Sequence, residues 1–320
     1  MKKVLAGLGA ALLLFVVGLA VYVASRQHLK FSVPLPAVAA ATDPAVVERG
    51  RYVVRNLASC PICHGDPKQM ERAQAGEEVP LSGGFEFNIP PGKFYPRNIT
   101  PDPETGIGRF SDGEIARALR YGVGRDSRAL LPFMEMQGLS DEDLTAVVSY
   151  LRSQPPVRND VPAHHFTLLG MIVKATVLAN PVGPKQTPPT ANPQGATVEN
   201  GRYLVESVAN CWSCHTQRDT KTGAMVGPHL GGATMSDEVN LKRTWAPPNL
   251  TGDPTTGRLA KLSEEEFVAR FRTGRVIPGS PMPWQGFQKL REDDLRAIYR
   301  YLKTVPPVVH DVGPPYVDKP

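Results

Sequence analysis

The chain has 320 residues, of which 21% are charged and 41% are hydrophobic, so it has the composition of a folded globular protein rather than a disordered one. Its 36 basic and 31 acidic residues leave a formal net charge of +5 without a long basic run, so nothing indicates nucleic-acid binding. Four cysteines are too few for a disulfide-dense secreted scaffold. A chain of this length is expected to form about two domains.

The N-terminal segment is predicted to cross a membrane. After Lys2 and Lys3, the residues from Val4 to Ala24 are uncharged and mostly apolar. As a helix rising ~1.5 Å per residue, this run spans about 30 Å, the thickness of a bilayer core. The two lysines predict a cytoplasmic N-terminus and an exported remainder. We therefore expect residues 1–26 to anchor the chain in a bacterial cytoplasmic membrane; a cleaved signal peptide is the alternative.

The rest of the chain is an internal duplication. Three blocks recur 151 positions later: Val47–Tyr52 as Val198–Tyr203, Cys60–His64 as Cys211–His215, and Asn98–Gly106 as Asn249–Gly257. One constant offset across separate blocks indicates two copies of one domain. We expect a first copy at residues 43–158, a linker at 159–195 and a second copy at 196–312.

Both copies are predicted to be helical. Capping boxes at Ser111–Glu114 and Ser263–Glu266, and a final segment with an apolar face of helical period, mark the helices. Alternating patterns typical of strands are hard to find, so the expected fold class is all-α. In the linker, Phe166–Asn180 is expected to form a short helix packed against the domains, with a segment at the membrane interface as the alternative.

All four cysteines lie in two C-x-x-C-H motifs. A zinc site would need the cysteine pairs to converge or further ligands, and a thioredoxin-like site would need a βαβ context. Covalent haem attachment needs no further assumption, because each thiol adds to a porphyrin vinyl group and the adjacent histidine reaches the iron. We therefore predict two covalently bound haem c groups, attached at Cys60, Cys63, Cys211 and Cys214, with His64 and His215 as proximal iron ligands.

A second axial ligand is expected near the end of each copy. Both copies place a methionine shortly before a Gln–Gly pair, and alignment on this pair matches Met134 with Met282. A methionine ligand raises the reduction potential of a haem. Met136 is an adjacent candidate in the first copy.

Residues around the proximal histidines are also predicted from the repeat. Pro80 matches Pro228, and a backbone carbonyl here is expected to accept the imidazole N–H and fix its tautomer. Asn98 and Asn249 are expected to shape a loop at the haem edge or, equally, to form local turns. Candidates for contact with the haem propionates are Arg97, Arg243 and Trp245.

Each copy resembles a class I cytochrome c domain. The Asn98–Gly108 segment, the capped helix after it and the late methionine are similar to the cytochrome c subunits of membrane-bound alcohol, aldehyde and gluconate dehydrogenases. The resemblance implies that His64 with Met134, and His215 with Met282, ligate the two irons. Those subunits typically carry three haem motifs and a C-terminal membrane attachment, whereas this chain has two motifs and an N-terminal apolar segment.

The predicted function is one-electron transfer at the periplasmic face of the membrane, since haem supplies the chemistry and no second catalytic constellation is visible. The expected partners are a membrane-bound dehydrogenase, a terminal oxidase or another cytochrome. Two alternatives stay open. One is a di-haem enzyme of the peroxidase or thiosulfate-oxidising type, and the other is a cytochrome subunit built into a terminal oxidase.

Overall fold

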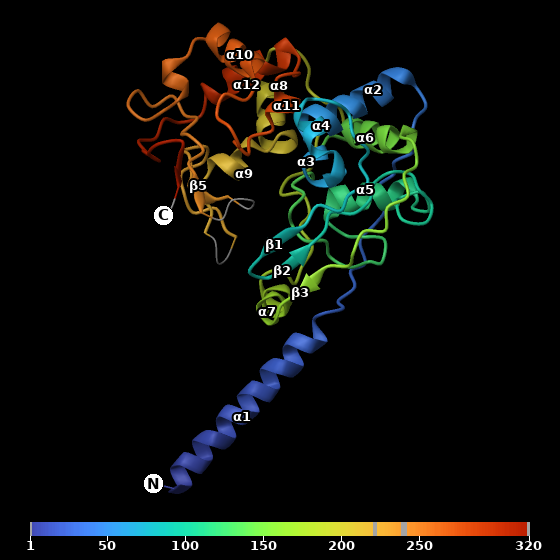
Figure 1. The fold of residues 1–320 in the computed structure, drawn as a ribbon, viewed down its shortest axis with the longest axis vertical. Coiled ribbons are helices and arrows are strands. Elements are labelled where there is room, and N and C mark those ends of the chain that lie inside the picture. The colour runs from blue at the N-terminus through green and yellow to red at the C-terminus, as the bar shows by residue number, and fades with distance from the viewer. Residues whose placement is uncertain (1, 220–222, 238–241, 319–320) are drawn as a thin grey trace.

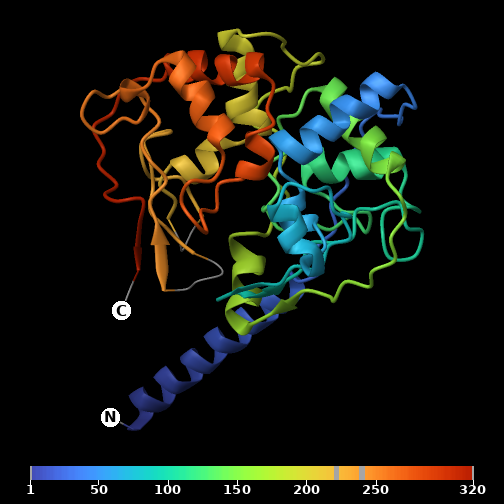
Figure 2. The same ribbon diagram turned by 45° about the horizontal axis from the view of Figure 1, so that its top comes forward.

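The computed structural model describes residues 2–219, 223–237 and 242–318. The predicted anchor begins at Met1 and the predicted second copy includes residues 220–222 and 238–241, and these positions lie outside the described residues. One long N-terminal helix projects from two helical halves that lie side by side (Figures 1 and 2). We refer to the first half as residues 43–158 and to the second half as residues 196–312.

Helix α1 (Lys2–Ser25) stands away from the rest of the molecule. Every one of its residues except Val23 is exposed. Among the described residues, α1 is the helix that is long and apolar enough to cross a membrane. A helix that is apolar on all sides and packs against little protein has a surface suited to lipid.

Each half is built on a pair of helices in close contact. The first helix of each half packs on the last one: α2 (Pro44–Tyr52) on α6 (Asp141–Ser153), and α8 (Val198–Tyr203) on α12 (Glu292–Leu302). Gly50 and Gly201 lie at these contacts, where an added Cβ would come within 1.9 Å of the carbonyl oxygens of Ala146 and Ala297. The missing side chains therefore allow the helices to approach this closely.

Shorter elements connect these helix pairs. The first half contains η1 (Val53–Leu57), α3 (Pro61–His64), η2 (Pro67–Gln69), α4 (Met70–Gln74) and α5 (Asp112–Tyr121). The second half contains η3 (Leu204–Val208), α9 (Cys211–His215), η4 (Leu259–Lys261), α10 (Glu264–Thr273) and α11 (Trp284–Phe287). Both predicted capping boxes are present, at Ser111 before α5 and at Ser263 before α10.

The fold is mostly helical, as predicted, but it is not all-α. Two three-stranded antiparallel sheets are present. The first contains β1 (Phe87–Ile89), β2 (Gly92–Phe94) and β3 (His165–Phe166). The second contains β4 (Met235–Ser236), β5 (Arg243–Trp245) and β6 (Tyr316–Asp318). Strands of two or three residues are too short for a period of two to be recognised. The strands β3 and β6 begin 151 positions apart, at His165 and Tyr316, so the duplication extends beyond residues 158 and 312.

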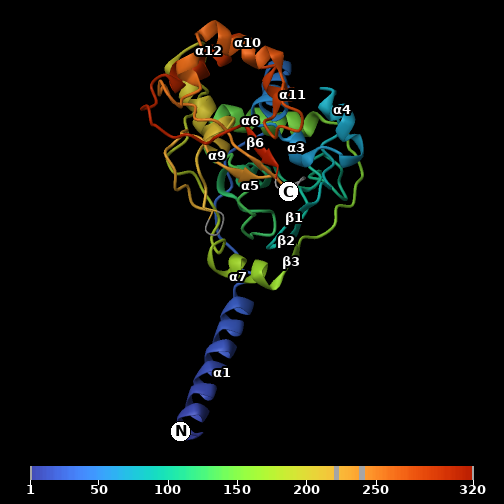
Figure 3. The ribbon, with the colours of Figure 1, turned by 60° about the vertical axis from the view of Figure 1, so that its left-hand side comes forward.

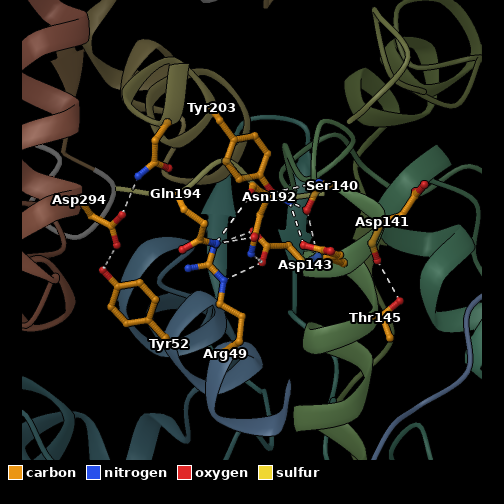
Figure 4. A network of polar contacts seen from close by, with 12 residues as sticks. Arg49, Tyr52, Ser140, Asp141, Asp143, Thr145, Asn192, Gln194, Tyr203 and Asp294 are labelled. Atoms are coloured by element: carbon orange, nitrogen blue, oxygen red, sulfur yellow. Dashed lines mark hydrogen bonds and ion pairs between the residues drawn. The ribbon is translucent and has the colours of Figure 1, made fainter. Parts of the chain in front are cut away.

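A buried polar network joins the two halves (Figure 4). Tyr52 in α2 donates its hydroxyl hydrogen to Asp294 in α12, and Tyr203 in α8 donates to Asp143 in α6, both over 2.7 Å. Each hydroxyl also accepts a backbone N–H at the start of the opposite helix, over 2.9 Å in both cases. Because both residues of each pair recur at the repeat offset, the interface has approximate two-fold symmetry.

Candidate functional site

Each C-x-x-C-H motif follows a π-helix and a left-handed residue. The π-helices η1 and η3 end shortly before the first cysteine of each motif. Ser59 and Asn210 directly precede that cysteine and have φ angles of 51° and 48°. This conformation ends the π-helix and starts the short helices α3 and α9, which carry the motifs. Asparagine adopts the left-handed region more readily than most residues. The local backbone is therefore the same in both halves.

Backbone carbonyls orient the two histidines of the motifs. The Nδ1 atom of His64 lies 2.7 Å from the Arg97 oxygen, and that of His215 lies 2.8 Å from the Pro248 oxygen. A carbonyl partner requires the hydrogen to be on Nδ1, which leaves the lone pair on Nε2. Within the described residues, the Nε2 atom of neither ring makes a hydrogen bond. Burial lowers the pKa of both histidines, which favours the neutral form that binds iron.

The carbonyls that orient the histidines are not the predicted ones. The Pro80 oxygen accepts the backbone N–H of Asp66 over 3.1 Å and the Pro228 oxygen accepts that of Gly231 over 2.9 Å, while both imidazoles bond to other carbonyls. Arg97 and Pro248 take this role, and they lie at the repeat offset of 151. The expectation was wrong because the acceptor depends on how a distant loop folds back over the motif, which spacing in the chain does not reveal.

Asn98 and Asn249 stabilise the loops that supply these carbonyls. The Asn98 side chain accepts the Thr100 N–H over 3.0 Å and donates to the Val157 oxygen over 2.7 Å. Asn249 makes the equivalent bonds over 2.9 Å and 2.8 Å. The first bond of each pair closes a local turn of the kind that asparagine favours. Both asparagines thus act on the histidines through the adjacent backbone.

The three propionate candidates have partners within the protein. Arg97 donates to the Val161 carbonyl over 2.8 Å, Arg243 pairs with Asp318 at 2.6 Å, and the Trp245 indole donates to Asp237 over 2.7 Å. Arg97 thereby holds the linker, and Arg243 holds the C-terminal strand β6. Contact with a propionate stays a prediction.

The two methionine loops each rest on the opposite half. An added Cβ at Gly138 would lie 2.7 Å from the Ser207 hydroxyl in η3, and one at Gly286 would lie 2.8 Å from the Asn56 oxygen in η1. These glycines complete the two Gln–Gly pairs, so both pairs occupy the same place in the two-fold interface. This equivalence supports the alignment that matches Met134 with Met282.

The packing of Met136 distinguishes it from Met134. Met136 packs against the buried core, and its counterpart in the same alignment, Trp284, is only 7% exposed. Met282 touches this core from the loop before α11, whereas Met134 is half-buried and, within the described residues, lies outside it. Since Met282 touches the same core, the choice of Met134 rests on its alignment with Met282, and Met134 stays the predicted ligand of the first half.

The first methionine loop is also bonded to the second C-x-x-C-H motif. Asn210, directly before Cys211, donates to the Glu135 carbonyl over 2.7 Å, and Arg218 pairs with the Glu135 carboxylate at 3.1 Å. Glu135 follows Met134 directly, so the second motif restrains the first methionine loop. Sequence analysis missed this contact because Asn210 has a serine as its counterpart and no motif of its own.

The two halves hold their methionine loops by different means. Arg120 is 4% exposed, donates to the Gln137 carbonyl over 3.0 Å and pairs with Asp141 at 2.7 Å. At the equivalent position of the second half stands Phe271, whose ring centroid lies 5.7 Å from that of Trp284. A buried guanidinium therefore holds the first loop. Aromatic packing holds the second, together with hydrogen bonds from the exposed Arg275 to the Ser280 carbonyl and the Gln285 side chain.

The cysteine environments disfavour thiolate chemistry. Burial raises the pKa of both Cys60 and Cys211 to about 12, whereas reactive or metal-binding cysteines have lowered values. Within the described part of the chain, no three His, Cys, Asp or Glu side chains are grouped to hold a metal ion. A raised pKa disfavours a redox-active dithiol or a zinc thiolate at these two cysteines.

Comparisons with known proteins agree with this geometry. The family model described as cytochrome c matches residues 198–306. The chain is 31% identical over 297 residues to the cytochrome c subunit of alcohol dehydrogenase (quinone) from Gluconacetobacter polyoxogenes, with 85% of this chain and 58% of the relative aligned. It is 31% identical over 284 residues to the gluconate 2-dehydrogenase cytochrome c subunit of Pantoea cypripedii, with 82% and 60% aligned. The chain therefore spans about three fifths of these two relatives.

A further relative matches this chain more closely in extent. The chain is 27% identical over 263 residues to a diheme cytochrome c-type protein of Cereibacter sphaeroides, with 78% of this chain and 82% of the relative aligned.

Proposed function

Because the chain carries a cytochrome c domain and is similar to cytochrome c subunits of dehydrogenases, we propose that it is a di-haem electron carrier anchored in the bacterial cytoplasmic membrane. Its haem halves face the periplasm and pass single electrons from a membrane-bound dehydrogenase to a respiratory acceptor. One observation carries the proposal: both motif histidines have Nδ1 bound to a carbonyl at the same repeat position, which leaves Nε2 for an iron.

The residues of both halves fit haem c. When bound, haem c supplies a one-electron iron couple. Cys60 and Cys63 would hold the first group and Cys211 and Cys214 the second, each pair being joined by one helical turn. His64 and His215 present a neutral imidazole whose orientation is set by a backbone carbonyl, and Met134 and Met282 supply the second ligands.

The membrane anchor is supported by the length and exposure of α1. Replacing residues 1–26 by a cleavable export signal should give a water-soluble protein that keeps both haems. A natural mature protein that starts near residue 25 and is soluble would instead show α1 to be a cleaved signal peptide.

The number of haems is tested on denatured protein. Acid–organic extraction should leave both haems attached, and the mass should exceed that of the polypeptide by two haem groups. Cys211→Ser combined with Cys214→Ser should remove one haem and leave the spectrum of the other. Extractable haem, or one haem in the wild type, would contradict the proposal.

The partner is tested by mild detergent extraction from membranes, with the co-purifying subunits identified by mass spectrometry. A membrane-bound dehydrogenase is expected, and a terminal oxidase would assign the chain to another host. Rapid oxidation of the ferrous protein by peroxide would favour the di-haem enzyme, because it requires an iron with a displaceable ligand.

A further inference from the structure

Helix α7 (Leu168–Thr176) of the linker lies across the C-terminal end of α1 (Figure 3). Hydrogen bonds join the end of α1 and the residues after it to α7: Arg26 to the Ala175 carbonyl over 2.8 Å, Gln27 to the Met171 carbonyl over 3.0 Å, and Lys174 to the Gln27 carbonyl over 2.7 Å. These contacts are specific and polar, so α7 is held at the level where the apolar helix ends.

The other side of α7 is held by the first half of the molecule. Thr167 caps the helix, donates its hydroxyl hydrogen to the Pro90 carbonyl over 3.0 Å and its N–H to the Pro91 carbonyl over 3.0 Å. An added Cβ at Gly170 would come within 1.9 Å of the Pro91 oxygen, which shows how closely α7 approaches the turn between β1 and β2. The helix is therefore a rigid bridge between α1 and the sheet of the first half.

Apolar side chains are exposed at both ends of α7, where Leu168 and Leu169 begin the helix and Val177 directly follows it. The exposed fractions of Leu168, Leu169 and Val177 are 69%, 51% and 52%. Gly170 and Ala175, which face the protein, are buried. Lys174 and Arg26 add positive charge at the same level. Apolar side chains beside basic ones are typical of helices that lie in a membrane interface.

We propose that α7 lies in the interfacial layer of the outer leaflet, with Leu168, Leu169 and Val177 inserted among the lipid chains. Lipid is the partner of these apolar side chains because hydrogen bonds hold α7 at the end of α1, a helix whose 24 residues match the bilayer in length. Residues 29–43 have no regular secondary structure, so α7 provides the second contact that orients the haem halves over the membrane. This inference rests on the proposal that α1 spans the bilayer.

Site-directed spin labelling of the full-length holoprotein tests the inference. The haems consume all four native cysteines, so Leu169→Cys introduces one reactive thiol for a nitroxide. The labelled protein is placed in nanodiscs of phosphatidylethanolamine and phosphatidylglycerol in the ferric state, and the relaxation rate measured without oxygen and nickel is subtracted to remove the contribution of the haems. The ratio of collisions with oxygen to collisions with a water-soluble nickel chelate then reports insertion into lipid.

Two further labels make the result decisive. Ala269→Cys places the label on an exposed position of α10, at the end of the molecule away from α1 (Figure 3), and Leu13→Cys places it on α1. We expect the collision ratio at Leu169 to exceed that at Ala269 several-fold, and Leu168→Cys should repeat this result. If the label at Leu13 is in lipid but the collision ratio at Leu169 equals that at Ala269, α7 is not inserted, and α1 still spans the membrane. If the label at Leu13 meets the nickel chelate, the anchor itself is wrong.

Discussion

Tyr52 of the first half donates its hydroxyl hydrogen to the buried carboxylate of Asp294 in the second half, over 2.7 Å. The repeat generates the reciprocal bond from Tyr203 to Asp143, so two equivalent Tyr–Asp bonds join the two halves (Figure 4). A two-fold interface is self-complementary, and every favourable contact in it occurs twice. The same interface brings each methionine loop against the π-helix of the other half, because Gly138 lies at Ser207 and Gly286 at Asn56.

Removing one of these hydroxyls should destabilise the protein. Tyr203→Phe leaves the buried Ser140 N–H without its partner and removes one of the two hydrogen bonds to Asp143 Oδ2, which keeps its bond from Arg49. Loss of a buried partner typically costs about 1–3 kcal/mol of unfolding free energy. Tyr52→Phe should cost at least as much, because Asn200 stands at the position that matches Arg49 and bonds the other carboxylate oxygen of Asp294, so Asp294 Oδ2 loses the partner that Tyr52 supplies. Denaturant unfolding followed by far-ultraviolet circular dichroism measures both. The exposed Tyr316→Phe is the control and should change the unfolding free energy by less than about 0.5 kcal/mol.

The interface should weaken in acid. Burial alone opposes ionisation of Asp143, but the hydrogen bond and charge of Arg49, with the hydroxyl of Tyr203 and the amide of Asn192, lower its pKa below the ordinary value of 3.8. A carboxyl with a lowered pKa stabilises the folded state above its unfolded pKa, and this contribution is lost as the pH falls through the folded pKa.

The unfolding free energy should therefore decline below about pH 4 for this reason. Asp143→Asn should be less stable than wild type at pH 7 and should lose less stability between pH 5 and pH 3. The exposed Asp126→Asn serves as the comparison. Equal acid sensitivity of Asp143→Asn and wild type would show that Asp143 does not contribute.

The ligand assignment predicts separable spectra. Ferric protein should show the weak red charge-transfer band of iron–methionine ligation, and Met134→His or Met282→His should each remove about half of it and lower the potential of one haem only, because a thioether favours ferrous iron. Met136→Leu keeps the core filled and should leave the band unchanged. A band lost in Met136→Leu but kept in Met134→His would shift the register of the first loop by two residues.

The bond from Asn210 to the Glu135 carbonyl predicts that the second motif controls the first iron site. In a Met282→His background the remaining red band reports on Met134 alone. Asn210→Gly keeps the left-handed backbone but removes this bond, so the band should weaken and bleach at a lower temperature than in the parent. Ser59→Gly is the matched control, since Ser59 has a similar φ and bonds within its own half. Equal behaviour of the two variants would assign the effect to the backbone turn.

The covalent and local features of this protein are readable from the sequence alone. Cys60 to His64 and Cys211 to His215 predict haem c because attachment depends on a spacing of a few residues, and the constant offset reveals the duplication without any structure. The capping boxes at Ser111 and Ser263 are equally local, and both are present. The apolar run that forms α1 depends only on composition.

Contacts between distant segments were decided by the tertiary structure. The carbonyls of Arg97 and Pro248, rather than those of Pro80 and Pro228, orient the histidines because loop folding determines which oxygen reaches the ring. In the sequence, Arg120 has the pattern of an ordinary arginine on a helix. The structure shows that it is buried and bonded to the methionine loop. The sheets escaped recognition because their strands are too short to show a period, and because β3 and β6 join them from distant parts of the chain. Sequence patterns report short-range geometry, whereas these features arise only when two folded halves and the linker pack together.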